Sequence, residues 1–200
     1  MIKKLPREFY TRDDVVLVAR ELIGKIIVTR FDNTYTTARI IETEAYEGIT
    51  DRASHAFGGR RTKRTEPMYA LGGSAYVYLC YGIHHLFNIV TNRKEIPHAV
   101  LIRSMEPLEG IPMMLKRTGK KHADQTLGKG PGNVGKALGI NIKHTGMDLV
   151  GEEIYLIDDG LTDFQIEVSK RIGIDYAGEA ADWLYRFTMK SPSVKKKVQT

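Results

Sequence analysis

A pair of carboxylates, a group of aromatic rings and a run of cations lie within about forty residues of one another in this sequence. The carboxylates are Glu42 and Glu44, and Tyr46 follows two residues later. A carboxylate can act as a general base toward water when nearby cations or hydrogen bonds keep it in the required ionisation state. Aromatic rings add stacking surfaces, and basic residues bind phosphates. This combination suits chemistry on a nucleobase.

The spacing of Glu42 and Glu44 does not distinguish between them. Side chains alternate along a strand, so Glu42, Glu44 and Tyr46 are expected on one face of the strand that carries them. An exposed strand glutamate paired with a surface lysine or arginine explains either residue equally well. Tyr46 favours a pocket slightly, because it places an aromatic ring beside a carboxylate.

Three tyrosines follow, and they fit two different structures. Tyr76 and Tyr78 suit the packing of a sheet, because tyrosine favours strands and half-buried positions. Tyr81 precedes Gly82 at an expected hairpin tip, where a bulky ring has little core to fill. A projecting aromatic residue can wedge between stacked bases of DNA.

The glycine-rich segment between these motifs carries Arg60, Arg61, Lys63 and Arg64. Such residues can neutralise phosphates and give salt-sensitive binding without sequence preference. A solvated charge run explains the same residues without any ligand. The sequence leaves both interpretations open.

Six histidines raise the possibility of a metal site, with His55, His84 and Glu44 as the most obvious ligands. No His-Glu-x-x-His motif is present, and Cys80 is the single cysteine, so the spacing matches no standard zinc arrangement. We therefore expect no metal and no other cofactor. A metal-dependent hydrolase and a non-catalytic DNA-binding protein remain the alternatives.

Composition favours one intracellular domain with an anionic partner. The 200 residues are 42% hydrophobic, which suits one domain over residues 1–200, ending in a short basic tail at about 193–200. The formal net charge of +6 is consistent with binding to nucleic acid. One cysteine excludes an internal disulfide, and no apolar run is long enough for a membrane helix or a signal peptide. We expect a cytoplasmic protein, in contact with the nucleoid, and no membrane partner.

Mixed helices and strands are expected to position these residues. Thr11 is expected to cap a helix that Gly24 ends, and Asn133 to cap another that carries Val134 and Leu138. Residues 47–73 lack periodicity and predict a long loop. The other expected helices span about 107–115, with Pro107 in the first turn, and 177–183. The expected strands span 26–28, 37–46, 75–79, 85–90, 99–103, 154–157, 164–168 and 184–189.

Taken together, these motifs resemble the alkyladenine (3-methyladenine) DNA glycosylase family, in order from about residue 5 to residue 194. The matching segments are Ile41–Tyr46, His55, Gly58–Arg60, Tyr76–Tyr78, Tyr81-Gly82, Asn88, Arg103, Glu106–Gly110, Gly130-Pro131 through Leu138, Arg171–Ile174, Ala177–Glu179 and Arg186-Phe187. The combination is far more specific than any one motif.

The resemblance implies a monofunctional enzyme that flips a damaged purine out of duplex DNA and hydrolyses its N-glycosidic bond. The implied substrates are 3-methyladenine, 7-methylguanine, hypoxanthine and ethenoadenine, and the implied state is a monomer. Glu44 would be the general base, with Arg103 and the carbonyl of Ile172 holding the water. The other implied roles are a base sandwich of Tyr46, His55 and Tyr78, exclusion of guanine by Asn88, a DNA wedge at Tyr81, and DNA contacts by Tyr76, Arg60, Arg61 and Lys63.

The resemblance also implies the fold. It is a single mixed α+β domain with a curved, mainly antiparallel β-sheet, surrounded by helices and carrying a protruding, DNA-intercalating β-hairpin. The strand pattern agrees with this fold but does not specify its topology.

Overall fold

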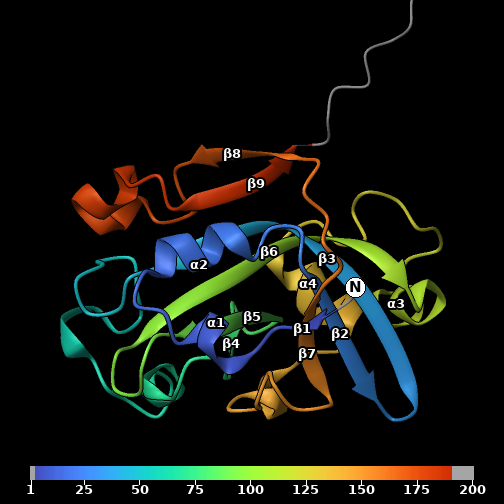
Figure 1. The fold of residues 1–200 in the computed structure, drawn as a ribbon, viewed down its shortest axis with the longest axis horizontal. Helices are drawn as coiled ribbons and strands as arrows, with labels where there is room; N and C mark the ends of the chain where they lie inside the picture. Colours follow the sequence, from blue (N-terminus) through green and yellow to red (C-terminus); the bar gives the residue numbers. More distant parts are fainter. Residues whose placement is uncertain (1–2, 191–200) are drawn as a thin grey trace, which may run out of the picture.

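The computed structural model describes residues 3–190 and builds them around one sheet (Figure 1). Its strands are β1 (Lys3–Lys4), β2 (Ile26–Phe31), β3 (Thr34–Tyr46), β4 (Ala75–Cys80), β5 (His84–Thr91), β6 (His98–Glu109), β7 (Ile154–Asp158), β8 (Gln165–Ser169) and β9 (Arg186–Lys190). Its helices are α1 (Arg7–Tyr10), α2 (Val15–Glu21), α3 (Ile111–Thr118) and α4 (Pro131–Leu138), with short 3₁₀ segments at Phe57–Gly59, Glu66–Tyr69, Ile142–His144 and Asp175–Asp182.

The strands follow the order β1-β7-β2-β3-β6-β5-β4, and β9 pairs with both β3 and β8. The pairs formed within residues 3–190 are antiparallel. The expected mixed α+β class with a mainly antiparallel sheet is therefore confirmed. Between residues 3 and 190, no helix has the length and apolar character needed to cross a bilayer.

Strand β3 is the element that positions the site. Its thirteen residues pair with β6 along one edge, while β2 and then β9 occupy the other edge. Glu44 lies opposite Leu101 of β6 and Arg186 of β9. Because neighbouring strands cover both edges here, the Glu44 side chain is completely buried.

Helix α2 packs on this part of the sheet, as Figure 1 shows. It buries Val15, Val18 and Ala19, and the hydroxyl of Thr43 on β3 donates to the carbonyl of Ala19 at 2.8 Å. The N-cap is Asp14, whose carboxylate accepts from the backbone N–H of Leu17, so the prediction that Thr11 caps this helix is wrong. Asp14 lies three residues after Thr11, directly before the first helical residue, and its carboxylate therefore accepts the hydrogen bond from the exposed N–H at the helix start.

Two further helix starts differ from the prediction, and proline explains both. Pro107 lies in β6, and α3 begins only after Gly110, which adopts φ +74°. Pro112 sits in the first turn of α3, where a backbone N–H has no partner within the helix, so the lack of an N–H in proline costs no hydrogen bond. Helix α4 begins at Pro131, so Asn133 is inside the helix and not its cap. The Asn133 amide donates instead to the carbonyls of Thr126 and Lys129.

Strands β4, β5, β7, β8 and β9 agree with the sequence pattern to within about two residues, whereas β2 and β3 are each three residues longer than expected and β6 continues six residues past its expected end, to Glu109. Strands β7, β8 and β9 occupy the three strands expected in the last third of the chain. The expected helix at 177–183 is a kinked 3₁₀ segment, Asp175–Asp182, with Gly178 in a non-helical conformation. The expected loop at 47–73 contains two 3₁₀ turns. The basic tail expected at 193–200 lies outside the described residues.

Candidate active site

A cavity of about 310 Å³ opens beside β3. Six of the residues predicted for catalysis and the base pocket line it: Tyr46, His55, Tyr78, Asn88, Arg103 and Ile172. Tyr76 and Tyr81 also contribute to its wall. Glu44 does not line the cavity, but it bonds to three residues that do. The structure therefore gathers a carboxylate, aromatic rings and a guanidinium around one space of limited size.

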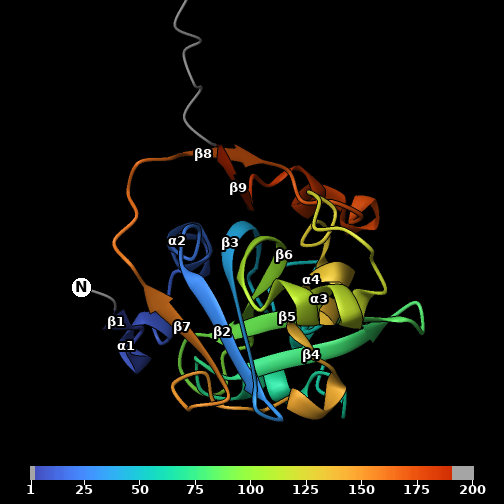
Figure 2. The same ribbon diagram turned by 90° about the vertical axis from the view of Figure 1, so that its right-hand side faces the viewer.

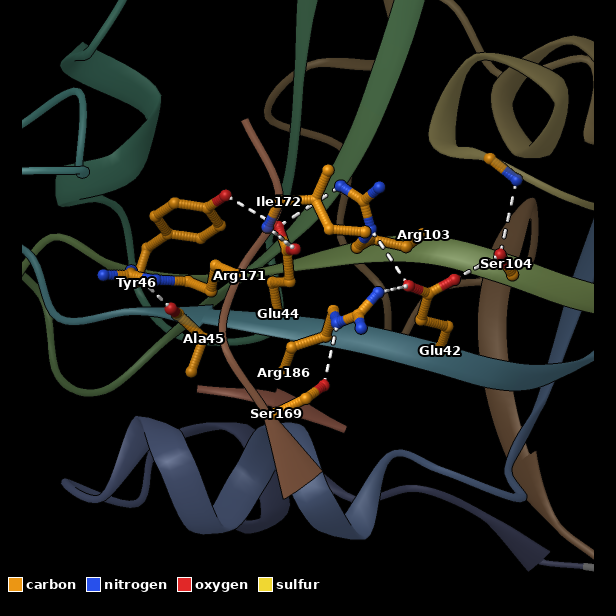
Figure 3. Close-up of polar contacts among 11 residues, drawn as sticks. Glu42, Glu44, Ala45, Tyr46, Arg103, Ser104, Ser169, Arg171, Ile172 and Arg186 are labelled. Carbon is orange, nitrogen blue, oxygen red and sulfur yellow. Dashed lines mark hydrogen bonds and ion pairs between the residues drawn. The ribbon is translucent and has the colours of Figure 1, made fainter. Parts of the chain in front are cut away.

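Glu44 receives three hydrogen bonds (Figure 3). Its Oε1 accepts from the backbone N–H of Ile172 at 2.8 Å, and its Oε2 accepts from the Tyr46 hydroxyl at 2.8 Å and from Arg103 Nη1 at 3.4 Å. An ionised carboxylate offers about four lone-pair sites. The three protein donors fix its orientation and leave about one site free, which is what a base needs to accept a proton from water.

The pKa of Glu44 lies above its ordinary value. Burial is the main cause, and the nearby charge of Glu42 adds to it. Arg103, the Ile172 N–H and the Tyr46 hydroxyl oppose the rise. A raised pKa makes the ionised carboxylate a better proton acceptor than an exposed glutamate, provided that the pH keeps it ionised.

An irregularity in the β3–β6 ladder brings Arg103 to this carboxylate. The register shifts on both sides of Glu42, which pairs with Ser104, while Thr43 pairs with Ile102. Arg103 is therefore the extra residue of its strand at this point. A bulge of this kind turns a side chain out of the regular alternation, and such bulges are common next to active sites.

An aromatic wall forms the other side of the cavity. The rings of His55 and Tyr78 meet edge to face with centroids 4.6 Å apart, and His55 Nδ1 lies 2.9 Å from the Tyr76 hydroxyl. Burial, with Arg64 and Arg60 nearby, lowers the pKa of His55 to about 4. His55 is therefore neutral at pH 7 and does not repel a cationic ligand. Tyr76 is only 2% exposed and lies behind His55.

Asn88 occupies a buried position on β5 opposite Leu101 and is 3% exposed. Its side-chain nitrogen donates to the backbone carbonyls of Tyr76 and Leu86, each at 3.2 Å. These two bonds fix the amide plane at the wall of the cavity. Any group that enters here meets a side chain that cannot easily turn away.

Tyr81 stands at the turn between β4 and β5. Cys80 pairs with His84, so three residues form the loop, and Tyr81 and Gly82 adopt φ +50° and +73°. Two consecutive left-handed residues match the twist of a tight hairpin. In Figure 2 this turn reaches the right-hand edge of the molecule. The Tyr81 side chain is 92% exposed, so its ring does not support the core.

The basic loop divides into different environments. Arg60, Arg61 and Lys63 are all exposed. Arg61 forms ion pairs with Glu66 and Glu95. Arg64 lines the cavity, with its guanidinium 5.1 Å from the Tyr78 ring centroid. The sequence pattern did not separate Arg64 from its neighbours, because the segment has no periodicity.

A second buried ion pair supports the site, and no local sequence pattern predicts it. Arg171 and Asp51 bond through two nitrogens and two oxygens, and neither side chain is exposed. Arg171 also donates to the carbonyl of Ala45 at 2.8 Å and lies over the Tyr46 ring, 4.8 Å from its centroid. The pair therefore anchors the segment that carries Ile172 against the end of β3. Asp51 sits in a loop, where no periodic signal marks a buried residue.

The ligand set of the alternative metal site is not assembled. Glu44 is buried, whereas His84 is exposed at the start of β5. Within residues 3–190, no group of three or more His, Cys, Asp or Glu side chains is arranged to hold a metal ion.

Comparison with known proteins agrees with this arrangement. Residues 8–193 match the family model for methylpurine-DNA glycosylase. A protein of Clostridium novyi is 46% identical over 204 residues, covering 98% of this chain and 100% of its own. A protein of Clostridium acetobutylicum is 45% identical over 94% of both chains, and one of Chlamydia felis is 42% identical over 96% of this chain and 99% of its own. All three are provisionally named as 3-methyladenine DNA glycosylases. The chain therefore belongs to the methylpurine-DNA glycosylase family, and it is a DNA glycosylase.

Proposed function

We propose that this enzyme removes alkylated purines from duplex DNA with a water molecule that Glu44 activates. The observation that carries the proposal is the environment of Glu44, which is buried, held by three donors and left with about one free acceptor site beside the cavity. Arg103 and the backbone carbonyl of Ile172 hold the water. The water oxygen attacks the sugar carbon C1′, the bond electrons leave with the base, and Glu44 takes the proton.

The charge of the substrate fits this mechanism. A purine alkylated at N3 or N7 is already cationic, so its glycosidic bond breaks without much protonation of the leaving group. The reaction then passes through a state that resembles an oxocarbenium ion. Ionised Glu44 lies close enough to stabilise that positive charge in a site shielded from water.

The cavity supplies the surfaces that a flipped base needs. Tyr46, His55 and Tyr78 stack on the base, and tyrosine rings attract a cation through their quadrupole. The neutral state of His55 adds no repulsion. The substrates that this pocket suits are 3-methyladenine and 7-methylguanine, with hypoxanthine and ethenoadenine as further candidates. Arg60, Arg61 and Lys63 contact the phosphates of DNA, whereas buried Tyr76 acts only by supporting His55. One monomer acts on one lesion in the cytoplasm.

Replacing Asn88 by serine is expected to relax the exclusion of guanine. The Asn88 amide is fixed by two backbone carbonyls, so the exocyclic amino group of guanine meets an immobile obstacle. Serine removes that obstacle, and guanine release should rise at least about tenfold relative to release of an adenine lesion. Both rates are measured by base release from matched duplexes. An unchanged ratio would remove Asn88 from the role of selectivity filter.

Replacing Tyr81 by alanine is expected to weaken capture of the flipped nucleotide without changing the fold. The exposed ring is proposed to fill the gap that the flipped base leaves, and stacking of this kind contributes about 1–3 kcal/mol. Affinity for a lesion-containing duplex should fall roughly tenfold or more. Tyr35→Ala, at an exposed tyrosine on another hairpin, is the matched control. Equal lesion affinity in Tyr81→Ala and the control would refute the wedge.

The proposed function is tested by base release from defined duplexes that carry 3-methyladenine, 7-methylguanine, hypoxanthine or ethenoadenine, with and without EDTA. We expect free base and an abasic strand, at rates that EDTA does not change. Loss of activity in EDTA would favour a metal-dependent hydrolase. Tight lesion binding without base release would favour a non-catalytic DNA-binding protein.

A further inference from the structure

Glu42 is a half-buried carboxylate, and three donors hold its two oxygens. Its side chain is 14% exposed and does not line the base cavity. Oε1 accepts from Arg103 Nε at 3.2 Å and from Arg186 Nη1 at 3.1 Å, and Oε2 accepts from the Ser104 hydroxyl at 2.6 Å. Figure 3 shows both arginines on one side of the Glu42 carboxylate and Ser104 on the other. An ordinary surface glutamate does not hold two guanidinium groups and a hydroxyl in this way.

The partners of Glu42 are themselves fixed by other elements. Ser104 accepts from the backbone N–H of Gly130, just before α4, at 3.3 Å. Arg186 of β9 donates from Nε to the Ser169 hydroxyl of β8 at 3.0 Å. Glu42 is thus held from β6, from β9 and from the start of α4. This support makes it a rigid reference point for Arg103.

Arg103 is shared between two carboxylates. Its Nε lies 3.2 Å from Glu42, and its Nη1 lies 3.4 Å from Glu44. A guanidinium with no second partner forms short, two-point bonds with a carboxylate. In that arrangement Arg103 would occupy the last free lone-pair site of Glu44 and would leave the position from which it can hold water. The contact with Glu42 prevents this rearrangement.

We propose that Glu42 is a positioning residue that restrains Arg103 and so keeps Glu44 free to accept a proton from water. The proposal rests on the proposed function of Glu44. Glu42 touches neither the substrate nor the reacting water. It acts only through the guanidinium that it shares with the general base.

This role has a characteristic effect on pH dependence. The charge of Glu42 raises the pKa of Glu44, while Arg103 lowers it. Neutralising Glu42 removes the first influence and frees Arg103 to strengthen the second. Tyr46, Tyr78 and the Ile172 N–H also face Glu44, and the substitution leaves them unchanged. Both effects lower the pKa of Glu44, so the acid limb of the rate profile should move to lower pH while the plateau rate falls.

The test is single-turnover release of 3-methyladenine by Glu42→Gln across a range of pH. We expect the plateau rate to fall about tenfold to a hundredfold, in line with a misplaced catalytic group. The acid limb should move to lower pH, and affinity for the lesion duplex should stay within about threefold. Ser104→Ala keeps the charge of Glu42 and removes one of its hydrogen bonds. Its plateau rate should therefore fall less than that of Glu42→Gln, and its acid limb should stay almost at the wild-type pH.

A Glu42→Gln enzyme with the rate and acid limb of the wild type would overturn the proposal. So would a lower rate with an unmoved limb, because that result indicates general damage to the site. If Glu42→Gln does not fold, a wild-type rate in Ser104→Ala counts against the restraint, and a reduced rate supports it only when lesion affinity and the urea unfolding midpoint of Ser104→Ala equal those of the wild type; a reduced rate with either of these changed counts against it. Failure of the proposed function is distinct: the wild-type enzyme would then release no base, or Glu44→Gln would be fully active.

Discussion

Replacing Asp51 by alanine is expected to lower the free energy of unfolding by about 3–5 kcal/mol, because it leaves the buried charge of Arg171 without its partner. Neither side chain of this pair is exposed. Asp51 also accepts from the backbone N–H of Ala53 at 2.9 Å, so the variant loses a loop contact as well. Urea unfolding measures the change. The urea concentration at the unfolding midpoint should fall, while the m-value stays similar to that of the wild type.

An exposed pair gives the matched control for this prediction. Asp182 bonds to Lys170, and most of each side chain is in contact with solvent. Asp182→Ala should therefore change stability by no more than about 1 kcal/mol. The double variant Asp51→Ala/Arg171→Met removes both charges and should be more stable than Asp51→Ala alone. An Asp51→Ala protein within 1 kcal/mol of the wild type would show that the pair does not support the fold.

Replacing Glu44 by glutamine is expected to reduce base release at least a hundredfold, in line with loss of a general base. Glutamine keeps the size of the side chain and one acceptor oxygen, but it cannot take a proton from water or stabilise a developing cation. Binding of the lesion duplex should be intact, because Glu44 is buried behind the cavity wall. Single-turnover rates and equilibrium binding on the same 3-methyladenine duplex separate these two effects.

Glu106→Gln is the control for this substitution, because Glu106 is an exposed glutamate on β6 outside the cavity. Its rate should equal that of the wild type. The stability of the two proteins adds a second check. The folded-state pKa of Glu44 is raised, so ionisation of Glu44 lowers stability as pH rises toward and through that pKa. Glu44→Gln should lack this decline, whereas Glu106→Gln should retain it.

The alternation of β3 was readable from the sequence, but the burial of Glu44 was not. Period-two spacing placed Glu42, Glu44 and Tyr46 on one face, and the Tyr46 hydroxyl does bond to Glu44. Burial depends on Leu101 and Arg186, which lie far away in the chain and flank Glu44 from β6 and β9. Local periodicity contains no information on such pairings. The choice of Glu44 over Glu42 came from the family resemblance.

Other parts of the site depend on irregular backbone. Arg103 reaches Glu44 through a register shift, and Asp51 reaches Arg171 from a loop. Neither feature has a sequence signature of its own, so residue patterns alone gave no reason to pair them. The misplaced caps at Thr11 and Asn133 have a simpler cause. Each prediction chose a good capping residue within a turn of the true start, where Asp14 or Pro131 was better placed.

The central claim is that ionised Glu44 takes the proton of the attacking water, and the pH dependence of single-turnover 3-methyladenine release tests it most directly. The wild-type rate, corrected for release without enzyme, should fall as pH drops through the raised pKa of Glu44. That limb should lie above the ordinary glutamate value of about 4.3. Glu44→Gln should show a rate at least a hundredfold lower and no such limb. An acid limb of the same position and amplitude in both proteins would contradict the mechanism.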